Sequence, residues 1–253
     1  MEIITSRQNS LISRIAKLQS SRKQRIQERA YVGDGTKLLE EAVRWAPDLL
    51  EAVVLQEGTP CPVLPPHVRA VQISRQLMQQ VSRMEAPEGA LFLCRMPEPE
   101  RGQSVQVQPG CLVLDGVQDP GNVGTILRTA DALDVPVLLT DGCADPWNSK
   151  TVRATMGAIF RTPPCQISHE ELVLQCRQNG IPLLASALSE RAEDLRNADL
   201  RSAAVIIGSE GRGVSPYLLE ASDGQVIIPM TPRCESLNAA SAATIFLWQL
   251  TTL

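Results

Sequence analysis

The sequence is poor in histidine, the side chain that most often acts as a general acid or base in catalysis. Only two of its 253 residues are histidines, His67 and His169. Neither lies in the glycine-rich segments described below, so nucleophilic catalysis by a serine or cysteine has no histidine base at hand. The seven cysteines are an odd number, and none forms a Cys-x-x-Cys pair. This pattern argues against a disulfide framework and against a metal site.

Other common signatures are missing as well. The chain has no G-x-x-x-x-G-K-[ST] segment and no G-x-G-x-x-G after a first strand. Their absence excludes a P-loop site and nearly excludes a nucleotide-dependent oxidoreductase. No apolar run is long enough to span a membrane, and the N-terminus has no apolar signal core. The expected location is therefore a reducing cytoplasm, with no membrane partner.

Aromatic residues and net charge are also low. Aromatics make up 3% of the chain, so the core has to consist of Leu, Val, Ile and Ala. The formal net charge is −4, so a nucleic-acid partner would need a local basic surface. The first thirty residues hold such an excess around an apolar helical stripe of Leu11, Ile15 and Leu18. The basic side chains that we expect to contact the phosphates of such a partner are Arg7, Arg14, Arg22, Lys23 and Arg25.

Apolar runs alternate with helical patterns in two separate series. Residues 1–98 predict a small α/β domain, which begins with one basic helix over residues 10–28. Residues 99–110 are rich in Pro, Glu and Gln and are typical of a linker. Residues 111–253 predict a second α/β domain with a mostly parallel sheet covered on both faces. Such sheets bind ligands at the carboxyl ends of their strands.

Three loops in the second domain share one design. Each follows an expected strand and is rich in small or polar residues, at 115–130, 206–215 and 227–243. Together they offer backbone amides and the side chains of Asn122, Arg128, Glu210, Ser236 and Asn238. This set suits a group transfer from a cofactor that is already activated, such as a sulfonium methyl donor, because the protein mainly has to align the acceptor.

In order and separation, the loops resemble the three motifs of the SpoU (TrmH-like) branch of the SPOUT RNA 2'-O-ribose methyltransferases. N-x-G-x-x-x-R is found at Asn122 to Arg128, G-[SA]-E-G-x-G at Gly208 to Gly213, and I-P-M with S-L-N at Ile228 to Asn238. The first domain more loosely resembles the ribosomal-protein-like substrate-binding domain that often precedes this catalytic domain.

The resemblance implies a fold and a set of partners. It implies a parallel-sheet SPOUT domain with a trefoil knot, a departure from the rule that chains do not thread through loops. It further implies a homodimer, RNA as substrate, and S-adenosylmethionine as cofactor without a metal. The cofactor contacts that it implies are Gly208, Gly213, Ile228, Met230 and Leu237.

The roles expected in catalysis follow from the chemistry of these side chains. Helical spacing places Gly124 and Arg128 on one face, and Asn122 is expected as the N-cap. A guanidinium is a poor base and a strong phosphate clamp, so Arg128 is expected to grip the RNA phosphate beside the 2'-hydroxyl, either assisting proton removal or fixing the hydroxyl. Glu210, Ser236 and Asn238 complete the expected catalytic set, although helix capping would also explain these polar residues.

The interpretation is a ribose 2'-O-methyltransferase that acts on ribosomal RNA. Transfer RNA is the alternative substrate. A non-catalytic RNA-binding or ribosome-assembly protein with a relic cofactor site is the alternative from another class.

Overall fold

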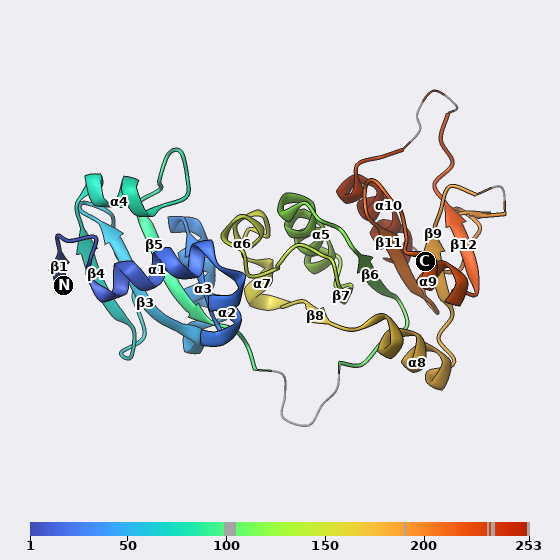
Figure 1. Ribbon diagram of the computed structural model, residues 1–253, viewed down its shortest axis with the longest axis horizontal. Helices are drawn as coiled ribbons and strands as arrows, with labels where there is room; N and C mark the ends of the chain where they lie inside the picture. Colours follow the sequence, from blue (N-terminus) through green and yellow to red (C-terminus); the bar gives the residue numbers. More distant parts are fainter. Residues whose placement is uncertain (99–104, 190, 232, 234–235, 252–253) are drawn as a thin grey trace. The chain divides into compact units, whose positions relative to one another are not determined.

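The computed structural model describes residues 1–98, 105–189, 191–231, 233 and 236–251. Its internal contacts divide the chain into two compact units (Figure 1). Unit 1 consists of Met1–Glu98 and Asp145–Arg161, and unit 2 consists of Pro99–Ala144 and Thr162–Leu253. Each unit is built around a sheet of its own, which we describe separately.

Unit 1 has a five-stranded mixed sheet in the order β1-β4-β3-β5-β2. β1, β4 and β3 run parallel, whereas β5 is antiparallel to both β3 and β2. The expected small α/β domain is therefore present, with a mixed sheet. The strands are β1 (Glu2–Ile4), β2 (Ala30–Asp34), β3 (Leu50–Gln56), β4 (Arg69–Ile73) and β5 (Ala90–Arg95).

Side chains of β5 alternate between two apolar layers because successive residues of a strand face opposite sides. Leu91 and Leu93 join the layer under α1 (Ser10–Ser20) and α4 (Arg75–Val81). Phe92 joins the layer under α3 (Thr36–Trp45), which a short 3-10 helix η1 (Pro47–Leu49) follows. The predicted stripe of Leu11, Ile15 and Leu18 is buried in the first layer, which confirms it.

The second layer of unit 1 is completed by residues from far along the chain. Val152 of α6 (Ser149–Ala154) and Ile159 and Phe160 of α7 (Ala158–Arg161) pack in the same apolar cluster as Phe92. Trp147 lies against Tyr31, with 4.8 Å between their ring centroids. The segment Asp145–Arg161 thus belongs to the core of unit 1, although in sequence it follows the first motif of the second domain.

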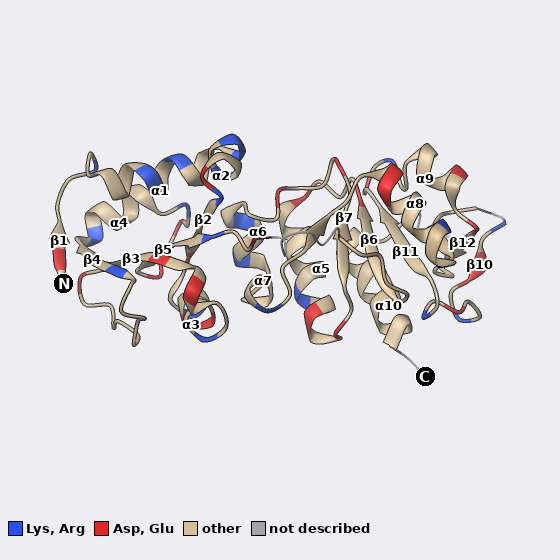
Figure 2. Ribbon diagram, turned by 90° about the horizontal axis from the view of Figure 1, so that it is seen from below, with Lys and Arg blue, Asp and Glu red and all other residues tan. Residues whose placement is uncertain are grey.

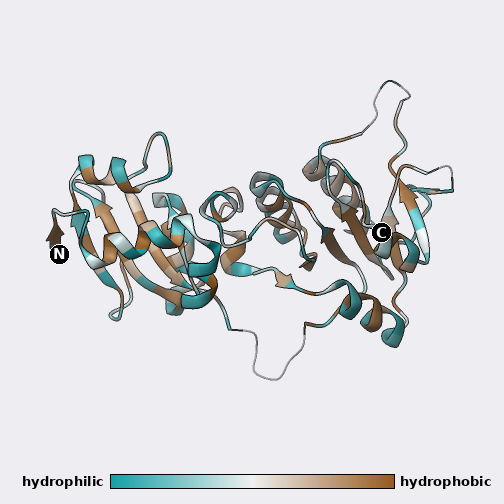
Figure 3. Ribbon diagram, in the orientation of Figure 1, coloured by the Kyte–Doolittle hydropathy of each residue, from teal (hydrophilic) through white to brown (hydrophobic). Residues whose placement is uncertain are grey.

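Unit 2 has a seven-stranded sheet in the order β10-β12-β9-β11-β6-β7-β8. Every neighbouring pair is parallel, which confirms the expected parallel sheet. The central strands are hydrophobic along their length (Figure 3), as a sheet covered on both faces requires. The strands are β6 (Cys111–Asp115), β7 (Val137–Leu139), β8 (Cys165–Gln166), β9 (Leu183–Ser186), β10 (Glu193–Asp194), β11 (Ala204–Gly208) and β12 (Gly224–Ile227).

Two pairs of helices cover the sheet of unit 2. Leu112 and Leu114 of β6 face the cluster of α5 (Pro120–Ala132) and α10 (Ala239–Thr251). Val113 faces the opposite cluster, which α8 (His169–Asn179) and α9 (Pro216–Ala221) cover. Gly180 is the C-cap of α8 and adopts φ of 64°, which glycine tolerates without strain. Val107, in the second half of the expected linker, is buried in this second layer, whereas residues 99–104 lie outside the described part.

Two helical segments of unit 1 are interrupted. The basic helix divides at Ser21, whose side chain accepts a hydrogen bond from the Gln24 N–H and caps α2 (Arg22–Glu28). The helical segment of residues 149–161 breaks between α6 and α7 at Met156 and Gly157, which adopt φ of 49° and 96°. A Cβ on Gly157 would lie 2.7 Å from Glu41 Cγ, so the break lets α3 approach closely.

Among the described residues, none of the helices combines the length and apolar character of a membrane crossing.

Candidate methyl-transfer site and RNA-contacting surface

The first loop connects β6 to α5, and its polar residues sit at defined places. Asp119 is the N-cap of α5, because its side chain accepts a hydrogen bond of 2.9 Å from the Asn122 N–H. The prediction that Asn122 caps this helix is therefore wrong. Pro120 fits the first helical position since its nitrogen needs no partner there, so the helix begins two residues before Asn122. This leaves the Asn122 side chain available for other contacts.

Asn122 joins all three loops. Its Nδ2 donates a hydrogen bond of 2.6 Å to Glu210 Oε1 in the second loop. Its Oδ1 accepts one of 3.1 Å from Asn238 Nδ2 in the third loop. Asn238 Oδ1 in turn accepts from the Ala240 and Ser241 N–H groups at the start of α10. Asn238 thus caps the last helix and also belongs to the polar chain, whereas its part in catalysis stays a prediction.

The second loop folds tightly on itself after β11. Ser209 and Gly213 exchange two backbone hydrogen bonds of 3.0 and 2.9 Å. Gly213 adopts φ of 68°, which glycine tolerates without strain. A Cβ on Gly208 would lie 2.0 Å from the Gly213 carbonyl carbon, so only glycine fits there. The motif glycines therefore close a narrow turn at the carboxyl end of β11.

The third loop leaves β12 and carries the other expected cofactor residues. Ile228 and Met230 are half-buried, and Ile228 packs against the apolar cluster beneath α5 and α10. Leu237 is 36% exposed just before α10. Ser236 is exposed beside it, and residues 232, 234 and 235 lie outside the described part. The loop thus leaves a set of apolar side chains partly uncovered.

A carboxylate and a histidine that the motifs did not identify lie beside the first two loops. Asp115, at the end of β6, accepts a hydrogen bond of 2.7 Å from the Ser215 N–H and one of 2.8 Å from His169 Nε2. Thr140 also donates to it, at 2.9 Å. Burial by itself raises the pKa of Asp115, but the hydrogen bonds from Ser215, Thr140 and His169 outweigh it and hold the pKa below its ordinary value.

The position of His169 explains why the sequence did not reveal it. It is the first residue of α8 and follows the two-residue strand β8, which is too short to stand out as an apolar run. Its ring also stacks on Tyr217, with 6.0 Å between centroids. A histidine therefore lies next to the site, but its imidazole is engaged with Asp115. One signal could have revealed it. Helices that follow parallel strands begin at the carboxyl edge of the sheet, so the first residue of the helix after β8 would be expected near the three loops.

Arg128 lies on α5, about 9 Å along the helix axis from Asn122 at 1.5 Å per residue. Its side chain is exposed, whereas Gly124, one turn earlier, is buried. Among the described residues it has no hydrogen-bond or ion-pair partner. The guanidinium is therefore open to a ligand, but the described contacts do not join it to the three loops.

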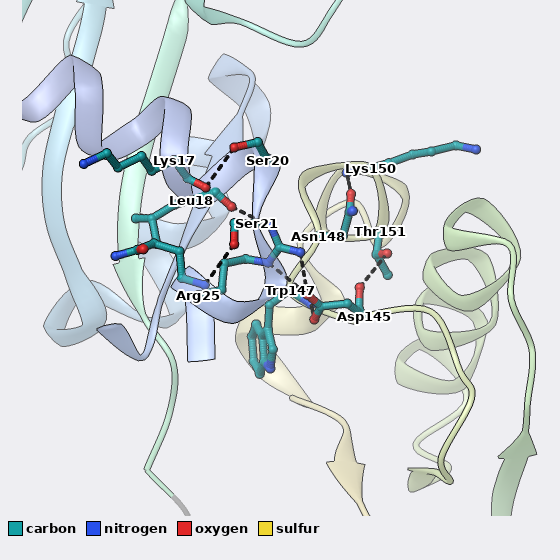
Figure 4. Close-up of polar contacts among 11 residues, drawn as sticks. Lys17, Leu18, Ser20, Ser21, Arg25, Asp145, Trp147, Asn148, Lys150 and Thr151 are labelled. Atoms are coloured by element: carbon teal, nitrogen blue, oxygen red, sulfur yellow. Dashed lines mark hydrogen bonds and ion pairs between the residues drawn. The ribbon is translucent and has the colours of Figure 1, made fainter. Parts of the chain in front are cut away.

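The basic residues of unit 1 fall into two groups. Arg25 is 3% exposed, and its Nε and Nη2 donate to Asp145 Oδ2 at 2.9 and 2.7 Å (Figure 4). Its Nη1 donates to the Leu18 carbonyl oxygen at 2.5 Å. Arg14 pairs with Glu28 and Glu51. Because Arg25 is buried, the expectation that it faces RNA does not hold in this structure. Arg14 is partly exposed beside its two carboxylate partners, and its contact with RNA stays a prediction.

The other three expected RNA contacts are exposed. Arg7 precedes α1, and Arg22 and Lys23 begin α2. Basic residues recur along α1 and α2 (Figure 2). Lys17 adds an exposed amine to the same helix pair. A basic surface therefore persists in unit 1 without Arg25.

In the described part of the chain, no group of three or more His, Cys, Asp or Glu side chains could hold a metal ion.

Comparison with known proteins agrees with this geometry. The family model SpoU rRNA Methylase matches residues 109–248, and the MRM3-like substrate binding domain matches residues 9–91. The chain belongs to the SpoU rRNA Methylase family. It is 32% identical over 252 residues to the 23S rRNA (guanosine(2553)-2'-O)-methyltransferase RlmP of Bacillus subtilis, covering 99% of both chains.

Two solved structures resemble the whole chain. An rRNA methyltransferase of Sinorhizobium meliloti with bound AdoMet has a TM-score of 0.83 and 26% identity, covering 98% of this chain and 97% of the other. A putative TrmH-family RNA methyltransferase of Porphyromonas gingivalis has a TM-score of 0.80 and 29% identity, covering 96% and 97%. The predictions of the family, of an RNA methyltransferase and of S-adenosylmethionine as cofactor are thereby confirmed.

Proposed function

We propose that this protein transfers a methyl group from S-adenosylmethionine to a ribose 2'-hydroxyl of ribosomal RNA. The observation that carries the proposal is the hydrogen-bonded chain Glu210–Asn122–Asn238. It ties the three motif loops together at the carboxyl edge of the parallel sheet, where such folds bind their ligands. Polar side chains that are fixed by one another can hold a substrate hydroxyl in one orientation.

The loops suit the methyl donor. The partly uncovered side chains of Ile228, Met230 and Leu237 suit its adenine and aliphatic parts, and Gly208 and Gly213 present backbone groups that no side chain of their own covers. These five residues would hold the cofactor. When bound, S-adenosylmethionine supplies an electrophilic methyl group, so the chain has to align the acceptor and needs no metal to activate the donor.

The side chains of the site then divide the remaining work. Arg128 is exposed and binds the phosphate next to the target ribose through paired N–H donors, which places the 2'-hydroxyl beside the loops. Glu210, held by Asn122, presents its carboxylate to that hydroxyl. Asn238 holds Asn122 in place, and Ser236 lies exposed in the same loop.

Charge supports RNA binding by unit 1. This unit contains 16 Lys and Arg against 12 Asp and Glu, whereas unit 2 contains 8 against 16. Because RNA affinity comes largely from phosphate contacts, unit 1 is the part that attracts the substrate. We assign phosphate contacts to Arg7, Arg22 and Lys23, and residues 1–98 to the substrate-binding part of the chain. Residues 111–253 are the catalytic part, although α6 and α7 pack in unit 1.

A homodimer, a trefoil knot and a cytoplasmic location complete the proposal. Ile245 and Trp248 of α10 are 40% and 64% exposed, which supports a partner surface on this helix. Membership of the SpoU family supports the knot, which the resemblance implies. An RNA substrate and the six free cysteines among the described residues support the cytoplasm.

Ribose-methylation mapping tests the function. RNA from cells with and without the gene is compared, beginning with the 23S rRNA position that matches guanosine 2553, because RlmP is named for it. We expect one methylation to disappear and to return with the wild-type gene but not with the Arg128→Ala variant. Loss of a tRNA methylation instead would favour the alternative substrate. Cofactor binding without transfer to any RNA would favour a non-catalytic protein.

A further inference from the structure

Unit 1 contains a cavity of about 110 Å³ between α1 and α4. Half-buried Ala16 of α1 and Val81 of α4 form apolar walls, and Arg7 and Arg83 stand at its exposed rim. Pockets that enclose a whole small molecule usually measure ~300–1,000 Å³. This cavity is therefore suited to a single group of a larger ligand.

A buried amide in the lining of the cavity lacks partners. Gln19 of α1 is 8% exposed, and neither its Nε2 nor its Oε1 has a hydrogen-bond partner among the described residues. Buried polar atoms in folded proteins are nearly always hydrogen-bonded, because an unpaired one loses its water without compensation. A ligand that accepts one hydrogen bond and donates another would satisfy both atoms of this amide.

This requirement distinguishes a nucleobase from a phosphate. A phosphate group of RNA offers only acceptors and would leave Gln19 Oε1 unpaired. The edge of an unpaired base presents donors and acceptors side by side, and its ring faces fit apolar walls such as Ala16 and Val81. A base in this position satisfies the amide and the walls together.

The rim of the cavity is suited to the RNA backbone on either side of such a base. Arg7 and Arg83 are exposed, and neither guanidinium has an ion-pair partner in the described part of the chain. The rim next to Arg83 is held in place by buried Asp34, whose Oδ2 accepts from Ser82 Oγ at 2.7 Å and from the Arg83 N–H at 3.3 Å. Two cations around a fixed rim favour the phosphates that flank the base.

We propose that this cavity binds one unpaired nucleobase of the RNA substrate, with Gln19 reading its hydrogen-bonding edge and Arg7 and Arg83 binding the flanking phosphates. The inference rests on the proposed function in that the ligand is RNA. It adds a site of base recognition outside the methyl-transfer loops.

Binding of short RNAs to the full-length protein tests the proposal. The probes are fluorescent 12-nucleotide single strands: U12, C12, A12, U12 with one central guanosine, and an abasic ribose-phosphate strand. We expect wild type to bind one base-bearing strand about tenfold more tightly than the abasic strand, and Gln19→Leu to lose this preference. The Tm of Gln19→Leu should equal or exceed that of wild type, because the substitution removes a buried unpaired amide. Gln79→Leu, on the exposed face of α4, is the matched control.

The rim arginines give an independent measurement. Arg7→Ala and Arg83→Ala should weaken binding to every strand by a similar factor and lower the salt slope by about one each, since phosphate contacts carry no sequence information. An unchanged base preference in Gln19→Leu overturns the proposal. It is equally overturned if wild type binds the abasic strand as tightly as the others, or binds none of them.

These failures differ from failure of the proposed function. If the wild-type protein methylates RNA in cells but shows no base preference in binding, only the proposal that the cavity binds a nucleobase is refuted. If the protein methylates no RNA, the proposed methyltransferase function itself is refuted.

Discussion

Asn122 Nδ2 and Glu210 Oε1 lie 2.6 Å apart, although 88 residues separate them in the chain. The contact holds the carboxylate of the second loop against the first turn of α5. Because Asn238 donates to the same asparagine, one side chain determines how three loops meet. The site therefore depends on Asn122 as a connector, a role that its place in the motif did not reveal.

Replacing this connector should separate fold from catalysis. We expect Asn122→Ala to lower the methylation rate constant about 100-fold, because a misplaced hydroxyl costs about that much in rate. Stability should fall by about 1–3 kcal/mol, because the two side-chain hydrogen bonds of Asn122, at about 0.5–1.5 kcal/mol each, are lost. Methyl transfer from radiolabelled cofactor measures the rate, and Gln118→Ala, exposed in the same loop, is the control. Full activity of Asn122→Ala would show that the connection is dispensable.

Arg128 should matter for RNA and leave the fold unaffected. Arg128→Ala is expected to lower kcat/KM for RNA at least about 100-fold, and Arg128→Lys to recover only part of it, because an ammonium lacks the paired donors of a guanidinium. Its Tm should match wild type, since an exposed substitution rarely exceeds about 0.5 kcal/mol. Cofactor affinity measured by calorimetry should also be unchanged. Arg177→Ala on α8 serves as a control, and equal activity of the two variants would contradict the role.

Two glycines of the second loop should behave oppositely. A Cβ at Gly208 meets backbone atoms of Gly213 and Val214 at 2.0 and 2.1 Å, whereas a Cβ at Gly211 meets no atom within 4 Å. Gly208→Ala should therefore weaken cofactor binding about tenfold or more and destabilise the protein by about 1–3 kcal/mol. Gly211→Ala should leave cofactor binding near wild type. Calorimetric titration of both variants decides, and similar affinities would argue against the tight turn.

The buried pair Arg25–Asp145 should support unit 1. Removing one partner, as in Asp145→Ala, leaves an unpaired buried charge and should cost about 3–5 kcal/mol. The exposed pair Arg69–Glu2 is the control, and Glu2→Ala should cost less than about 1 kcal/mol. The double variant Arg25→Met with Asp145→Leu should regain much of the loss. Chemical denaturation measures all three, and equal effects of the two single changes would show that burial is irrelevant here.

Asp115 should make stability depend on pH in the acid range. Its hydrogen bonds hold its pKa below the ordinary value, so the unfolded chain binds its proton more readily than the folded one. The contribution is present above about pH 4, the ordinary pKa of aspartate, and is lost as the pH falls through the lower folded value. Asp115→Asn should therefore be less stable than wild type at pH 6, by a margin that shrinks toward pH 3. A margin independent of pH would exclude this origin.

Much of the architecture was predictable from local patterns. Buried strands such as Cys111–Asp115 and Ala204–Gly208 stand out as apolar runs, and Leu11, Ile15 and Leu18 show helical spacing. Parallel order then places the loops after these strands at one edge. Helix boundaries were less certain, because Asp119 and Asn122 are both good caps and only the proline between them decides.

The sequence by itself determined that there are two α/β domains, that the second has a parallel sheet, and which residues form the three loops. Periodicity and motif spacing are properties of short segments, so they can be recognised without the tertiary structure. Only the tertiary structure decided that Asn122 connects the loops, that His169 binds Asp115, that α6 and α7 complete unit 1, and that Arg25 is buried against Asp145. Each of these depends on side chains that are distant in the chain, and their pairing follows from packing and desolvation, which no local pattern records.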